Sequence, residues 1–172
     1  MSDLIIAAFA SQNAAFVAGE SLAALQSAAG TEPEDIVVVT REASGRVSVH
    51  QSLNLATGAP LGDGRWGALI GLMFLDRRSA STTGLAAQLR ATGLDGDFLR
   101  DVAQMLDRGG AAVGLRVRLL GVDRVRETLA RSTGLPRVLH ARLSASVEAA
   151  LQDLQGQIPQ QAVGQAASDG AP

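Results

Sequence analysis

The sequence contains no cysteine and no lysine, and aromatic residues make up only 3% of it. Without cysteine the chain can form no disulfide and no thiol-ligated metal site. All fifteen basic residues are arginines. Because aromatic side chains are so few, aliphatic and alanine side chains must fill most of the core. The chain has 172 residues, of which 47% are hydrophobic, and this is enough for one domain with its own core.

The charge pattern argues against a nucleic-acid partner. Acidic and basic residues are interspersed, and the formal net charge at pH 7 is −2, whereas a dedicated nucleic-acid-binding protein normally shows a basic face. The first residues, MSDLIIAAFASQN, place no basic segment ahead of a short apolar stretch, so a secretory signal is not expected. We therefore expect a cytoplasmic protein, with membrane association as the alternative.

The first fifty residues predict a strand, a helix and two further strands. Residues 3–10 are a short apolar run without a helix-start signal, which indicates a buried strand. A helix is predicted over 13–30, since small and apolar residues recur there at helical spacing. The β-branched run 35–42 and the alternating run 46–52 predict two strands, joined by a hairpin turn at Gly45. The predicted inward positions of the helix are Ala15, Ala18, Leu22, Leu25 and Ala29.

The second half repeats this order. GLDGDFLRDVAQML predicts a helix capped by Asp95, and residues 111–120, 122–134, 136–144 and 144–158 then read as strand, helix, strand and helix. Two β-α-β units with short connections favour an α+β fold: a ferredoxin-like sheet with helices on one face. We expect one domain over 1–158, with a helical insertion at about 57–108 carrying a Gly-rich apolar segment. We expect residues 159–172 to form a disordered tail.

The stretch GDGRWGALIGLMFLDRR, residues 62–78, is the least ordinary part of the chain. Its ten apolar residues span about 15 Å as a helix, while a bilayer core needs roughly 30 Å, so one such helix cannot cross a membrane. Gly67 and Gly71 lie on one helical face and permit close backbone approach. A helix that is apolar all round is buried somewhere, in its own domain, against another protomer or at a membrane surface. The predicted contact residues are Trp66, Gly67, Ile70, Gly71 and Phe74.

No motif in the sequence predicts catalysis, a metal or a cofactor. His50 and His140 lie in predicted strands without a third ligand at diagnostic spacing. The acidic residues near Asp95 are explained by helix capping and the helix dipole. GDGRWG lacks the lysine and hydroxyl residue of a phosphate-binding loop. Arg116 is predicted to lie on the solvated face of its strand, within a local basic patch that also includes Arg118, Arg124 and Arg126.

Four segments in order resemble a bacterial family of unknown function: VHQSLNLATGAPLG followed by WGALIGLMFL, then GLDGDFLRDVAQML, GGAAVGLRVR and RVLHARLS. The resemblance covers roughly residues 3–155. Members of that family are usually described as predicted membrane proteins. The resemblance implies ferredoxin-like halves around a glycine-rich apolar hairpin, and it implies no catalytic residues. In this chain the second arm of the hairpin carries Gln88 and Arg90 and many hydroxyl side chains.

Three hypotheses for the function follow. The first is a non-enzymatic structural or interaction protein that self-associates as a homo-oligomer through the Gly-rich apolar helix 65–75. The second is a membrane-associated protein that uses the same segment as an anchor. The third is a ferredoxin-like domain that binds a small ligand in a cleft lined by the insertion.

The predicted tail can be tested by truncation. Residues 159–172 contain little apolar surface, so burial there cannot offset the entropy lost on ordering. Removing them should leave the melting temperature nearly unchanged in a thermal unfolding experiment. A drop of many degrees would mean that the tail docks on the folded domain.

Overall fold

The computed structural model describes residues 2–28, 36–51, 73, 91–106, 109–117, 121–132 and 134–157. The predicted tail lies outside these residues, as does most of the predicted insertion. The described part is an α+β fold built on one five-stranded antiparallel sheet. Its strands are β1 (Ser2–Phe9), β2 (Ile36–Arg41), β3 (Val47–Gln51), β4 (Ala111–Val117) and β5 (Arg137–Leu143).

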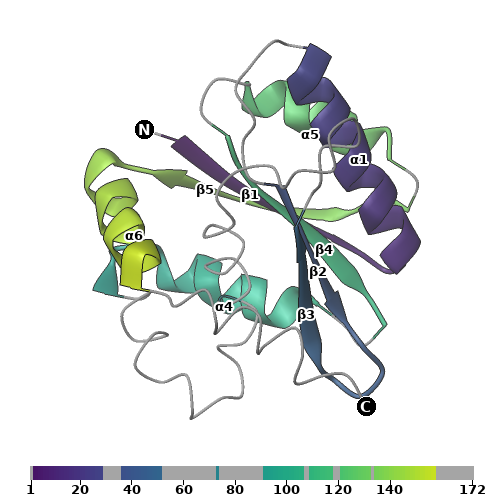
Figure 1. The fold of residues 1–172 in the computed structure, drawn as a ribbon, viewed down its shortest axis with the longest axis horizontal. Coiled ribbons are helices and arrows are strands. Elements are labelled where there is room, and N and C mark those ends of the chain that lie inside the picture. Colours follow the sequence, from purple (N-terminus) through teal and green to yellow (C-terminus); the bar gives the residue numbers. More distant parts are fainter. Residues whose placement is uncertain are drawn as a thin grey trace.

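The strand order is β3-β2-β4-β1-β5 (Figure 1). The first and fourth strands, predicted over 3–10 and 111–120, are adjacent in the sheet, with Ile5 opposite Leu115. Both are buried along almost their whole length. The β2–β3 hairpin turns as predicted at Gly45, whose φ of 91° lies in the region that favours glycine.

Two helical crossovers interleave in this sheet. Helix α1 (Gln12–Ala28) joins β1 to β2, and helix α5 (Val122–Ala130) joins β4 to β5. Since β1 and β2 both run antiparallel to β4, they are parallel to each other and separated by it. In the same way β4 and β5 are parallel to each other and separated by β1. In each β-α-β segment, the two strands are therefore separated by one strand of the other segment.

Helical layers cover both faces of the sheet, so the expectation of helices on one face is wrong (Figure 1). Helices α1 and α5 pack on the face that carries Ile5 and Val113, and the predicted stripe of α1 is buried there at Ala15, Ala18 and Leu22. Helices α4 (Gly96–Met105) and α6 (Ala145–Gln157) pack on the opposite face. The physical reason lies in β1, β2 and β4, whose apolar side chains point to both faces. The α4 and α6 side chains of that second layer are Phe98, Leu99, Val102, Met105, Leu151 and Leu154.

An ion pair joins α6 to the centre of the sheet. The Arg116 Nη1 atom of β4 donates to the Glu148 Oε1 atom of α6 at 3.1 Å, and the two side chains are only 12% and 11% exposed. The sequence predicted that Arg116 lies on a solvated face. This prediction is wrong. The strand alternation that placed Arg116 on a polar face is correct, but α6 covers that face.

Breaking this pair should destabilise the domain. Glu148→Ala leaves the Arg116 guanidinium in a nearly buried site without its carboxylate, at a cost of about 2 kcal/mol in the free energy of unfolding. Asp153→Ala on the same helix is the matched control, because Asp153 is exposed, and it should change that free energy by less than about 0.5 kcal/mol. Urea unfolding of both variants measures the difference. Equal losses would show that the pair contributes nothing specific.

Candidate functional site

The five predicted contact residues, Trp66, Gly67, Ile70, Gly71 and Phe74, lie outside the described residues. One neighbour of theirs is described. Met73 is helical and fully buried, and it belongs to the same core cluster as Phe98 and Leu99 of α4. The centre of the predicted apolar segment therefore packs against the domain's own core at this residue.

The two histidines lie on the two edge strands of the described sheet. On β3, the Nε2 atom of His50 is 3.1 Å from Thr40 Oγ1, and its ring meets the Phe16 ring edge to face, with centroids 5.4 Å apart. Desolvation by burial lowers the pKa of His50. On β5, the Nε2 atom of His140 is 2.7 Å from Asp3 Oδ1. Within the described ranges, no group of three acidic, histidine or cysteine side chains could hold a metal ion.

Helix α4 begins as its sequence predicts. The Oδ1 atom of Asp95 accepts a hydrogen bond from the Asp97 backbone N–H at 2.9 Å, so Asp95 is the N-cap. Leu94 and Leu99 on either side of the cap are both buried. Arg100 forms an exposed ion pair with Asp97. Capping thus accounts for the Asp95 side chain and the ion pair with Arg100 accounts for that of Asp97, and the cap marks the point where the chain enters α4.

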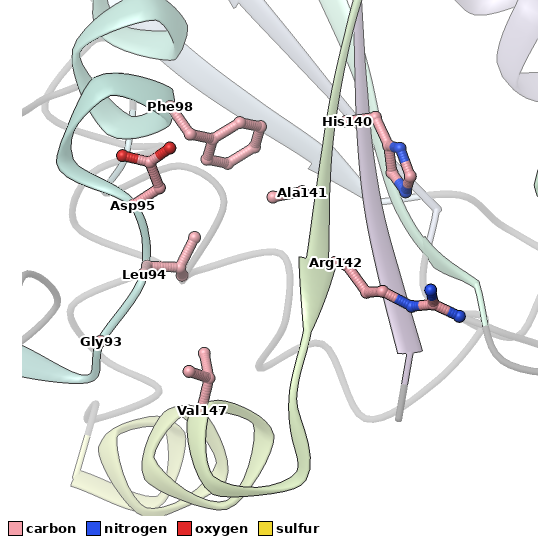
Figure 2. Close-up of a pocket in the computed structure, with 8 residues that line it drawn as sticks. All are labelled: Gly93, Leu94, Asp95, Phe98, His140, Ala141, Arg142 and Val147. Atoms are coloured by element: carbon pink, nitrogen blue, oxygen red, sulfur yellow. The ribbon is translucent and has the colours of Figure 1, made fainter.

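A hollow of about 330 Å³ lies beside this helix start, against β5 and the start of α6 (Figure 2). Leu94, Phe98 and Val147 turn toward Ala141 of β5, and they form an apolar wall. Asp95 stands at the same side of the strand. The complete lining is Gly93, Leu94, Asp95, Phe98, His140, Ala141, Arg142 and Val147.

The hollow borders β5 along residues 140–142. His140 and Arg142 point away from Ala141, to the other side of the strand (Figure 2), yet all three residues line the hollow. Successive side chains of a strand point to opposite faces, so three consecutive lining residues mean that the backbone edge between them also borders it. Within the described sheet, β5 pairs with β1 alone.

Gly93 permits the close packing that forms one wall. Its φ of 94° is a conformation that side chains with a Cβ rarely adopt, and a Cβ at this position would stand 3.3 Å from the Val147 Cγ2 atom of α6. The glycine therefore lets the chain before α4 turn sharply and lie against α6. The wall it helps to form is apolar.

Sequence reasoning missed this site. Its residues come from three segments, 93–98, 140–142 and 147, that lie far apart in the chain. Periodicity assigns each of them to an element, but it does not say which elements meet. One signal was available: the last strand carries Arg137, His140 and Arg142 among its seven residues, and such charge is typical of a sheet edge.

The fold and the hollow define an α+β domain with a recess beside an outer strand of the described sheet, and one wall of that recess is apolar. The model of the family described as "Protein of unknown function (DUF1269)" matches residues 60–155, and the chain belongs to this family. No curated protein and no solved structure matches the chain. The family is of unknown function, in agreement with that part of the resemblance, and its description assigns no role to the hollow. Among the described residues, no helix has the length and apolar character needed to cross a bilayer.

Two glycines of this region provide a matched test of the packing. Gly93→Ala should lower the free energy of unfolding by about 1–2 kcal/mol, because it puts a Cβ on a left-handed residue and against Val147. Gly96→Ala should be neutral or stabilising by up to about 1 kcal/mol, since it lies in α4 with no atom near its Cβ position. Chemical denaturation of both variants checks this. Similar values for the two would contradict the positions assigned to them.

Proposed function

We propose that the protein is a non-enzymatic interaction protein that self-associates through the glycine face of the apolar helix predicted over 65–75. The observation that carries the proposal is the complete burial of Met73, in helical conformation, within the core of its own domain. This residue gives the predicted helix an orientation. If the predicted helix forms, the side that carries Met73 would pack on the chain itself, and we expect the opposite side to meet a partner.

Helical geometry then separates the predicted contact residues into two groups. At about 100° per residue, Gly71 is about 160° from Met73, and Gly67 is about 120° from it. Trp66, about 20° from Met73, falls on the same side as that residue. The side away from the core therefore carries the two glycines, which allow a second helix to approach closely. By this reasoning we expect Trp66 to face the domain's own core.

The proposal extends to the fold. The order β2-β4-β1-β5 with its two interleaved β-α-β segments supports a ferredoxin-like arrangement. In that interpretation β3, the glycine-rich segment and α4 are inserted between β2 and β4. Met73 belongs to the same core cluster as the buried residues of α4, so the segment at 65–75 would be anchored on the α4 side of the sheet.

One observation favours a second candidate, the binding of a small ligand. The hollow beside β5 has an apolar wall and a volume of about 330 Å³, close to the lower limit for small-molecule sites. Under this alternative a mainly apolar compound would co-purify with the protein or raise its melting temperature. Membrane association remains the third alternative, and it requires detergent to keep the protein in solution.

Two substitutions in the predicted helix test self-association. Gly71→Leu should push the two helices apart, and overpacking of this kind costs about 1–3 kcal/mol, which weakens assembly by about one to two orders of magnitude. Its mass in detergent-free solution should fall while the protein stays folded. Met73→Ala should lower the melting temperature, because truncating a buried methionine costs about 2–5 kcal/mol of stability. Its mass should stay that of the wild type, because the glycine face is intact.

Light scattering at matched concentrations and temperatures below both melting points measures the masses. A monomeric wild type would place the glycine face inside its own domain and reject self-association. A wild type that needs detergent would support the membrane alternative in its place. If Gly71→Leu lowered the melting temperature as much as Met73→Ala does, the orientation derived from Met73 would be wrong.

A further inference from the structure

The edge of β5 combines unpaired backbone with a recess. Within the described residues β5 has a strand on one side only, so alternate N–H and C=O groups on its other side are available to a further strand. The hollow opens at the middle of this edge, at residues 140–142. An added strand could therefore form main-chain hydrogen bonds with β5 and place a side chain in the recess at the same position. Recognition by strand addition uses both kinds of contact.

The charges of β5 indicate what kind of strand fits. The strand carries Arg137 and Arg142 and no acidic residue. His140 already has a carboxylate partner in Asp3, whereas Arg142 is exposed and has no ion pair with any described residue. Pairing of β5 with β5 of a second copy would bring two arginines from each chain to one ladder, and like charges across a ladder are destabilising. An acidic strand has the complementary charge.

We propose that the β5 edge and the adjoining hollow dock an extended segment of another protein, in which apolar and acidic residues alternate. The segment adds to the sheet as a strand beyond β5. Because its successive side chains point to opposite faces, an apolar side chain enters the recess between Phe98 and Val147 while the acidic neighbour faces Arg142. This interaction goes beyond the proposed self-association and uses a different surface.

A peptide titration tests the proposal with the full chain. The probe is a short fluorescein-labelled peptide in which leucine alternates with glutamate, and fluorescence anisotropy reports its binding. The control peptide has the same composition plus a central proline, which lacks the N–H needed by the strand ladder. The control should bind about tenfold more weakly, the equivalent of about one backbone hydrogen bond. Hydrogen exchange should show new protection at residues 137–143 only with the first peptide.

Three variants of the protein assign the binding to this edge. Ala141→Leu fills the recess and should weaken binding about tenfold. Arg142→Glu should weaken it about three- to fivefold at low salt, the range for an exposed ion pair, and the loss should shrink at high salt. Arg126→Glu, which makes the same change of charge at an exposed position on α5, should bind like the wild type. Circular dichroism would check that all three variants are folded. If Ala141→Leu does not fold, the comparison of Arg142→Glu with Arg126→Glu still tests the proposal.

Each of the following results would overturn the proposal. The alternating peptide does not bind, or it binds no better than the proline peptide. Arg142→Glu and Arg126→Glu weaken binding equally, which would indicate a general charge effect. Ala141→Leu lowers the mass of the protein without affecting the peptide, in which case a second copy occupies the edge. A small apolar dye binds in the recess and is not displaced by the peptide, in which case the hollow is a small-ligand site.

Discussion

The antiparallel pairing of β1 with β4 is the constraint on which the rest of the fold depends. Ile5 and Ile6 are both fully buried although they point to opposite faces of the sheet, and Leu115 opposite Ile5 is buried as well. A pair of strands that is apolar on both faces cannot leave either face in water, since each exposed aliphatic side chain forfeits about 1.5–3 kcal/mol of burial. Both faces must therefore be covered by helices, and the short crossovers α1 and α5 cover only one of them. The other face is covered by α4, α6 and Met73.

Because different helices cover the two faces, the two edges of the described sheet differ. At the β3 edge, Phe16 of α1 reaches the ring of His50, so that edge is partly covered on the α1 side. At the β5 edge the neighbouring elements are the starts of α4 and α6, which approach each other through Gly93 and Val147 but leave a hollow beside Ala141. A sheet built from interleaved β-α-β segments places its last strand at an edge, and among the described residues the recess borders this strand, which has a strand partner on one side only. The nearly buried Arg116–Glu148 pair joins the sheet to α6, which forms one side of this recess.

Much of the secondary structure could be read from local pattern. The strand predicted over 3–10 is Ser2–Phe9, the hairpin turns at Gly45, and Asp95 caps α4. These features depend on alternation, helical spacing and capping, which involve only residues close in the chain. The prediction for Arg116 was wrong for the opposite reason. The alternation of β4 correctly placed Arg116 and Leu115 on opposite faces of the strand. Whether the Arg116 face meets water depends on α6, whose Glu148 is 32 residues further along the chain.

The sequence by itself therefore determined the strands and helices of the described residues and the absence of disulfides and thiol-bound metals, because hydrophobic period and composition are properties of the chain alone. Only the tertiary structure decided which faces are covered, that Met73 packs on its own core, and that Gly93, Ala141 and Val147 meet around a hollow. Those relations join residues from distant parts of the chain, such as Leu4 and Leu154 in one core cluster. They follow from the way the helical layers complete a sheet that must be buried on both sides, and no local period in the sequence records that packing.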